Sequence, residues 1–108
     1  MSSLPILISD DQKDVLDALK LLLKGEGFLC VPVQSPEAAL EALRRQPFSL
    51  VILDLNYTRD TTSGAEGMEL LSKIRLQDAD IPAIVMTAWG SVDLAVQAMR
   101  LGANDFIE

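Results

Sequence analysis

Three carboxylates and one hydroxyl follow short apolar runs of this sequence, and side chains of these types could hold a metal ion. Asp10 and Asp11 come directly after one apolar run, and Asp54 ends another. Thr87 follows a third. Carboxylates that lie close together repel one another, and a hard divalent cation such as Mg²⁺ relieves that repulsion. These residues predict a Mg²⁺ site if the fold brings the three runs side by side.

The composition excludes several other chemistries. The chain has 108 residues, no histidine and one cysteine, Cys30. The absence of histidine removes Ser-His-Asp and Cys-His catalysis and any histidine-based metal site. A single cysteine cannot form an internal disulfide, which fits a reducing cytoplasm. Chemistry therefore has to come from carboxylates, hydroxyls and lysines.

Charge and hydropathy indicate the kinds of partner. Sixteen acidic residues against nine basic ones give a net charge of −7. This excess argues against direct nucleic-acid binding, because contact with phosphates needs a basic patch. It suits a cation or a basic partner. No apolar run approaches the ~18 residues of a membrane span, and Met1-Ser2-Ser3 lacks the features of a signal peptide. We expect a cytoplasmic protein without membrane contact.

Short apolar runs alternate with amphipathic stretches along the chain. The runs predict five strands, at residues 5–9, 28–33, 50–53, 83–86 and 105–107. Between them we expect one helix that Asp11 can cap and Gly25 can end, a second that Ser35 caps and that stops before Pro47, a third over 67–77, and a fourth that Ser91 caps and that runs to about Leu101. Residues 55–66 are polar and indicate a loop.

The order βαβαβαβαβ predicts one α/β domain over residues 1–108. Apolar strands that alternate with helices form a parallel sheet covered on both faces, with right-handed crossovers. The carboxyl ends of such strands meet at one edge, where ligands bind. Asp10, Asp11, Asp54 and Thr87 should therefore converge at that edge. The plainer alternative is that these acids cap helices or face water, and Asp11 in particular can serve as an N-cap.

A family resemblance rests on these residues and on the end of the chain. The sequence resembles the receiver domain of bacterial two-component response regulators at Asp10-Asp11, Asp54, Thr87-Ala88 and Gly102-Ala103-Asn104-Asp105-Phe106. The runs 87–90 and 102–108 resemble the nitrogen-regulator class, whose members carry a sigma-54-activating ATPase and a DNA-binding domain downstream. The resemblance implies a flavodoxin-like, doubly wound, five-stranded parallel sheet with strand order 2-1-3-4-5.

The resemblance implies a role for each acidic residue. Asp54 is similar to the phosphoacceptor, which takes a phosphoryl group from the phosphohistidine of a sensor histidine kinase. Asp11 resembles the direct Mg²⁺ ligand, and Asp10 the ligand that acts mainly through water. Asn56 would offer its backbone carbonyl to the metal. Such a domain is a phosphoacceptor with slow self-hydrolysis and not a turnover enzyme.

Other residues would transmit the phosphorylated state. By resemblance, Thr87 turns its hydroxyl to the phosphoryl group, and Ala88 leaves room beside that group. Phe106 occupies the aromatic switch position of the family. The alternative is that Phe106 is a plain core residue of the last strand. The helix over 92–101 has a thin apolar face of small side chains, so it should be the least firmly held. Its movement would switch a transcriptional output domain of the same chain, of the sigma-54 type.

The sequence departs from the family pattern in two places. The family's lysine would be the residue after Glu108, and no fifth helix, often part of the family's dimer face, follows the fifth strand. We therefore expect a receiver domain truncated after the fifth strand, which switches poorly by itself. The sequence leaves open whether this domain forms a homodimer. The loop 57–66 is longer than in the family. It either contacts the partner kinase or shields Asp54, or it is a tolerated insertion.

Three other functions fit the sequence less well than a receiver domain. A non-phosphorylated, receiver-like interaction or dimerisation module would need no Mg²⁺, which the acidic set argues against. An aspartyl-phosphate hydrolase usually needs a second acid two residues after its nucleophile, and Asn56 cannot do that work. A nucleotide-binding protein would have a glycine-rich loop where Asp10 and Asp11 stand.

Overall fold

The computed structural model describes residues 4–55, 65–87 and 92–107, and it contains five strands and four helices in alternation. In chain order they are β1 (Ile6–Ser9), α1 (Lys13–Gly25), β2 (Cys30–Val33), α2 (Pro36–Arg45), β3 (Leu50–Asp54), α3 (Ala65–Gln77), β4 (Ala83–Met86), α4 (Val92–Arg100) and β5 (Asp105–Ile107). Each expected strand and helix is present. No helix in the described ranges is long and apolar enough to cross a membrane.

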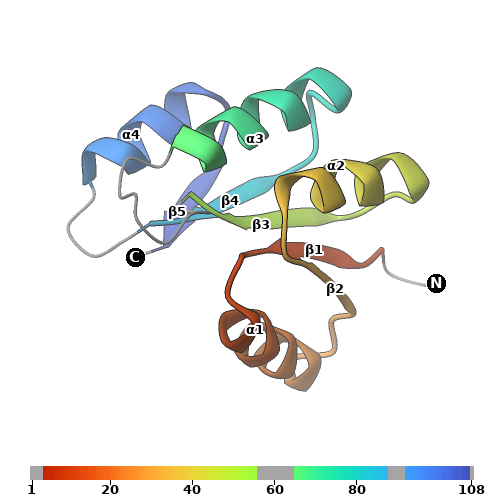
Figure 1. Cartoon of the computed structure of the whole chain (residues 1–108). Helices are drawn as coiled ribbons and strands as arrows, with labels where there is room; N and C mark the ends of the chain where they lie inside the picture. The colour runs from red at the N-terminus through yellow and green to blue at the C-terminus, as the bar shows by residue number, and fades with distance from the viewer. Residues whose placement is uncertain (1–3, 56–64, 88–91, 108) are drawn as a thin grey trace.

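The strands form one parallel sheet in the order β2-β1-β3-β4-β5, which confirms the expected topology. Figure 1 shows α1 on one face of this sheet and α2, α3 and α4 on the other. Ser9 pairs with Leu53, and Asp54 pairs with Met86. The carboxyl ends of β1, β3 and β4 therefore lie next to one another, as the strand order requires.

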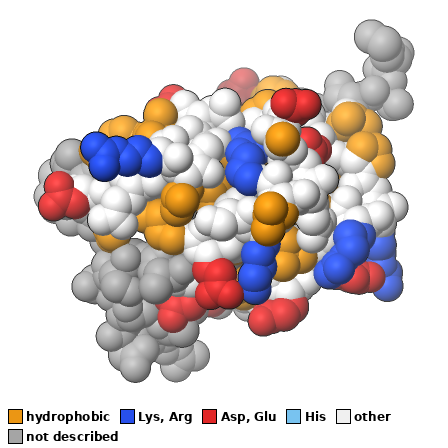
Figure 2. Space-filling model, turned by 90° about the horizontal axis from the view of Figure 1, so that it is seen from above, with side chains coloured by type: hydrophobic (Ala, Val, Ile, Leu, Met, Phe, Trp, Pro, Cys, Tyr) orange, Lys and Arg blue, Asp and Glu red, His pale blue; other side chains and the backbone are white. Residues whose placement is uncertain are grey.

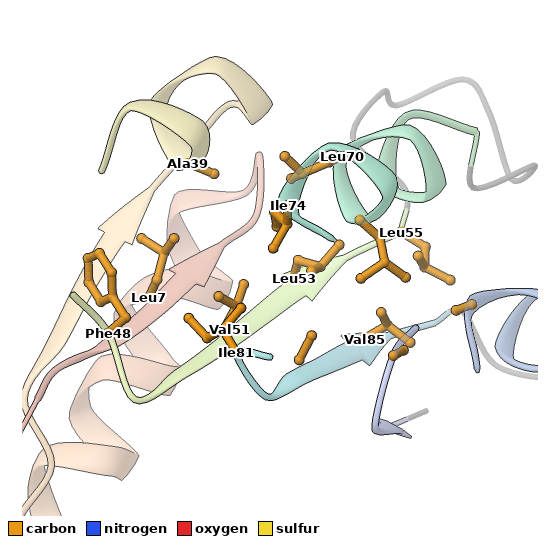
Figure 3. Close-up of a cluster of buried hydrophobic side chains, with 14 residues drawn as sticks. Leu7, Ala39, Phe48, Val51, Leu53, Leu55, Leu70, Ile74, Ile81 and Val85 are labelled. Atoms are coloured by element: carbon orange, nitrogen blue, oxygen red, sulfur yellow. The ribbon is translucent and has the colours of Figure 1, made fainter. Parts of the chain in front are cut away.

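Alternate side chains of each strand point to opposite faces, so the sheet has two cores. Leu7, Val51 and Leu53 join the larger cluster with Leu70, Leu71 and Ile74 of α3 (Figure 3). The smaller cluster contains Ile6, Ile8, Ile52 and Leu16 of α1. Because β1 and β3 are buried on both faces, their carboxyl ends are held firmly in place.

The starts of three elements, two helices and one strand, differ from expectation. Gln12, and not Asp11, is the N-cap of α1, and its side chain makes no capping bond. Its backbone N–H donates to Oδ1 of Asp10 at 2.8 Å, so the carboxylate that stabilises this turn comes from one residue earlier. The prediction that Asp11 caps the helix is therefore wrong. In addition, α3 begins at Ala65, two residues before the expected start at Gly67. The strand β2 begins at Cys30, two residues after the expected start at residue 28.

Two other helix ends agree with the sequence patterns. Ser35 Oγ accepts a hydrogen bond from the Ala38 N–H at 3.1 Å and caps α2, as expected. Gly25 is the last residue of α1. The expected cap at Ser91 lies outside the described residues.

The packing of α4 agrees with the expected thin apolar face. Ala95 and Ala98 are buried and Leu94 is partly buried against the larger cluster, whereas Val96 and Met99 are exposed. Two buried methyl groups and one partly buried leucine remove less apolar surface from water than several large buried side chains would, so α4 gains little free energy from packing. On the side of the molecule seen in Figure 2, acidic and basic side chains are interspersed. Among the exposed ion pairs, Lys73 and Glu69 of α3 lie 3.0 Å apart.

Candidate functional site

Three carboxylates meet at the carboxyl edge of the sheet. Asp10 directly follows β1, Asp11 is the next residue, and Asp54 ends the neighbouring strand β3. One carboxylate oxygen from each residue lies within 4.8 Å of the other two. Asp10 is 3% exposed, while Asp11 and Asp54 are partly exposed. The expected convergence of these three residues is therefore present.

The electrostatics of the cluster are visible in the pKa of Asp10. Burial, which disfavours the charged carboxylate, raises this pKa from 3.8 to about 6. The Gln12 N–H opposes the rise, and the negative charges of Asp54 and Asp11 add to it. A positive ion among these oxygen atoms would oppose the effect of those charges. The all-oxygen donor set suits a hard cation such as Mg²⁺, so the residues present fit that metal.

An open hollow lies beside the cluster on the side of Asp11. Its volume is about 440 Å³, and it is open to solvent. Its lining residues are Asp11, Gln12, Lys13, Asp14 and Gln34. A hydrated ion or a small phosphoryl donor therefore has room to approach Asp11 from solvent.

Thr87 supplies the hydroxyl at the same edge. It follows β4, one residue after Met86, which is the partner of Asp54 in the sheet. The Thr87 side chain is 8% exposed, and its Oγ1 has no hydrogen-bond partner among the described residues. Its backbone N–H donates to Ile107 O at 2.9 Å, which ties this strand end to β5. A buried hydroxyl without a partner is uncommon, and this one can still donate a hydrogen bond to an acceptor at the edge of the sheet.

The remaining predicted site residues have different outcomes. Asn56 and Ala88 lie outside the described residues. Phe106 pairs with Val85 on the edge strand β5 and is 38% exposed. A side chain exposed to this extent is not a plain core residue, so that interpretation of Phe106 is wrong for the described part of the chain. Its role as a switch stays a prediction.

Sequence reasoning missed one contact next to the site. Gly67 of α3 lies against Leu55, the residue after Asp54, and the Gly67 N–H donates to Leu55 O at 3.1 Å. The sequence reasoning took Gly67 as the expected start of a helix and, by resemblance, as the glycine that ends the family's loop, but it did not predict a contact with Leu55. The available signal was a glycine in the first turn of a helix, where glycine is less favourable than alanine by about 1 kcal/mol.

Together the sheet order and the acidic edge define a flavodoxin-like α/β domain with a candidate cation site of three carboxylates. The sequence profile of the response regulator receiver domain matches residues 6–108. The chain belongs to this family.

Individual relatives agree with this assignment. The response regulator protein FleR of Pseudomonas aeruginosa is 44% identical over 104 residues, which are 94% of this chain and 20% of FleR. A putative NtrX-like response regulator of Rickettsia bellii is 33% identical over 108 residues, which are 100% of this chain and 22% of that protein. The chain thus spans about a fifth of these two relatives. The crystal structure of the NtrX receiver domain from Brucella abortus has a TM-score of 0.87 and 32% identity, covering 95% of this chain and 83% of that one.

Proposed function

We propose that residues 1–108 form a receiver domain that accepts a phosphoryl group on Asp54 from the phosphohistidine of a sensor histidine kinase. One observation carries the proposal: three carboxylates with oxygens within 4.8 Å of one another lie at the same edge as the buried Thr87 hydroxyl, which has no partner in the described part of the chain. The acidic cluster suits a divalent cation, and the hydroxyl suits a further acceptor oxygen. A phosphoryl group on Asp54 with Mg²⁺ satisfies both.

In the proposed transfer, a carboxylate oxygen of Asp54 attacks phosphorus. The new P–O bond forms as the P–N bond to the imidazole breaks, and the imidazole leaves with that electron pair. Asp10, Asp11 and Asp54 would hold Mg²⁺, with the Asn56 carbonyl as a further ligand and Asp10 acting mainly through water. When bound, this ion neutralises charge on the transferring phosphoryl group. The domain then hydrolyses its own acyl phosphate slowly, so it is a phosphoacceptor and not a turnover enzyme.

Thr87 would transmit the phosphorylation of Asp54 to α4. Its hydroxyl can donate to a phosphoryl oxygen, and the segment that joins Thr87 to α4 would follow, with Ala88 small enough to leave space. Only two small side chains of α4, Ala95 and Ala98, are fully buried among the described residues, and Leu94 is partly buried, so a small change in free energy can shift this helix. Phe106 on the adjacent edge strand is the second proposed switch residue.

The proposed partners follow from the same role. They are a cytoplasmic sensor kinase, an output domain in the same protein and, in some states, a second copy of the chain. The FleR and NtrX-like relatives are about five times as long as the matched region. This length leaves room for output domains, and we propose a transcriptional output of the sigma-54 type.

Intact mass spectrometry tests the proposal. The protein is incubated with Mg²⁺ and acetyl phosphate, and separately with phosphoramidate, whose P–N bond resembles that of phosphohistidine. We expect the mass of one phosphoryl group to be added, and to be absent in Asp54→Asn. Asp93→Asn, which removes an exposed acid in the first turn of α4, is the matched control and should react like the natural chain.

Two results would contradict the proposal. One is no mass gain with either donor together with no Mg²⁺ binding, which would favour the non-phosphorylated interaction module. The other is a mass gain that persists in Asp54→Asn, which would place the acceptor elsewhere.

A further inference from the structure

Gly67 stands out among the glycines of the described residues because a Cβ added to it would overlap the backbone of another segment. Gly27 and Gly102 have positive φ angles of 89° and 113°, which favour glycine. Gly67 has no positive φ and lies in the first turn of α3, where alanine would be intrinsically better. The reason for glycine at this position must therefore be tertiary.

The tertiary reason is a close approach of two backbones. A Cβ on Gly67 would lie 2.6 Å from the carbonyl oxygen and 2.7 Å from the carbonyl carbon of Leu55, and would also overlap its Cα. Ordinary contact begins at 3.4 Å, so a side chain would push α3 and Leu55 apart by most of an ångström. The obstacle is backbone, which cannot rotate away as a flexible side chain can.

The backbone of Leu55 connects the end of β3, which carries Asp54, to the end of β4, which Thr87 follows. Its C=O accepts from the Gly67 N–H at 3.1 Å, and its N–H donates to Met86 O at 3.1 Å. Asp54 precedes Leu55, and Thr87 follows Met86. Leu55 itself is fully buried. A displacement of Leu55 would therefore change the spacing between the carboxylate of Asp54 and the hydroxyl of Thr87.

We propose that Gly67 is a positioning residue of the phosphoacceptor site, an inference that rests on the proposed function. The missing Cβ lets the first turn of α3 rest on the Leu55 backbone. That contact holds the end of β3 at the correct distance from the end of β4. Gly67 touches neither the phosphoryl group nor the metal, and it acts through Leu55 alone.

The test compares Gly67→Ala with two controls. Gly25→Ala adds the same methyl group at the end of α1, where nothing lies within 4 Å. Leu71→Ala removes buried methyl groups from α3 and adds no atom against the Leu55 backbone, so it destabilises the helix by another route. The readouts are the urea midpoint, the amide chemical shifts of Leu55 and Thr87 without metal, the Mg²⁺ dissociation constant, and the phosphorylation rate with acetyl phosphate.

We expect Gly67→Ala to shift both amide resonances, to weaken Mg²⁺ binding and to slow phosphorylation by about tenfold to a hundredfold, the range that a misplacement of about 1 Å can produce. Leu71→Ala should lower the urea midpoint yet keep the natural dissociation constant and rate while folded. Gly25→Ala should resemble the natural chain throughout. If Gly67→Ala is too unstable, all proteins are compared in trimethylamine N-oxide, which favours the folded state.

The outcomes separate this inference from the proposed function. If the natural chain is phosphorylated and folded Gly67→Ala reacts at the same rate, the positioning role is overturned and the proposed function stands. If Leu71→Ala slows the reaction as much as Gly67→Ala does, the effect comes from general destabilisation of α3, and the positioning role is again overturned. If the natural chain accepts no phosphoryl group, the proposed function fails.

Discussion

The Arg75 guanidinium on α3 donates two hydrogen bonds to the carbonyl oxygen of Gly102, from Nε at 3.0 Å and from Nη2 at 2.6 Å. The same side chain also donates to Ile81 O and, at 3.1 Å, to Asn104 Oδ1. That Asn104 oxygen accepts from the Ala83 N–H at 2.8 Å. Arg75 therefore ties the carboxyl end of α3 to the turns that precede β4 and β5. The carboxyl end of α4, next to Gly102, is held, so under the proposed function its amino end is the part that would respond to Thr87.

Arg75→Gln should destabilise the fold. A glutamine can replace at most part of this set of bonds, and the carbonyl oxygens that it leaves unpaired are partly buried. We expect a loss of about 2 kcal/mol in the free energy of unfolding, measured by urea denaturation. The matched control is Lys73→Gln, which breaks only the exposed pair with Glu69 and should cost less than about 1 kcal/mol. Equal losses in the two variants would show that the Arg75 contacts have no special value.

The buried carboxyl of Asp10 predicts an unusual pH dependence for the metal-free protein. Burial, with a further contribution from the charges of Asp54 and Asp11, raises its pKa from 3.8 to about 6. Between these values the folded state binds more protons than the unfolded state. The contribution of this group to stability is therefore present at low pH and is lost as the pH rises through about 6.

Urea unfolding in EDTA over a pH series measures this effect. Asp10→Asn keeps a side-chain oxygen for the Gln12 N–H but cannot ionise, so it isolates the contribution of Asp10. Relative to that variant, the natural chain should lose stability as the pH rises from 3.8 to about 6. A free-energy difference that stays constant or increases with pH would contradict the raised pKa.

Mg²⁺ should stabilise the domain and remove that pH-dependent loss above about pH 6. A cation bound by the three carboxylates favours their ionised forms and binds only the folded arrangement. At a free concentration about one hundred times its dissociation constant, it should add about 2.7 kcal/mol to the free energy of unfolding. NaCl at matched ionic strength is the control for screening. Equal effects of the two salts would argue against a specific site.

Thr87→Val should stabilise the unphosphorylated domain while abolishing its response. Valine has nearly the shape of threonine but no hydroxyl, so it removes a buried group without a partner among the described residues. We expect a gain of about 1 kcal/mol in the free energy of unfolding. Amide exchange in α4 should change on addition of beryllofluoride in the natural chain and in Thr87→Ser, but not in Thr87→Val. A response that survives in Thr87→Val would remove Thr87 from the switch.

The sequence by itself determined the order of the elements and the identity of the acidic edge. Short apolar runs bounded by polar residues mark the strands, and Asp10, Asp11 and Asp54 stand where those runs end. In a parallel sheet all carboxyl ends share one edge. Local patterning and one topological rule therefore suffice to predict that these side chains meet.

Only the tertiary structure decided how the residues at that edge are held. The backbone contact of Gly67 with Leu55, the bonds from Arg75 to Gly102 and the exposure of Phe106 all depend on segments distant in sequence. The same is true of the raised pKa of Asp10, because burial and neighbouring charges produce it. Local periodicity reports which face of an element is apolar. Distances of a few ångströms between elements are set by how whole side chains and backbones pack, and no short sequence pattern contains them.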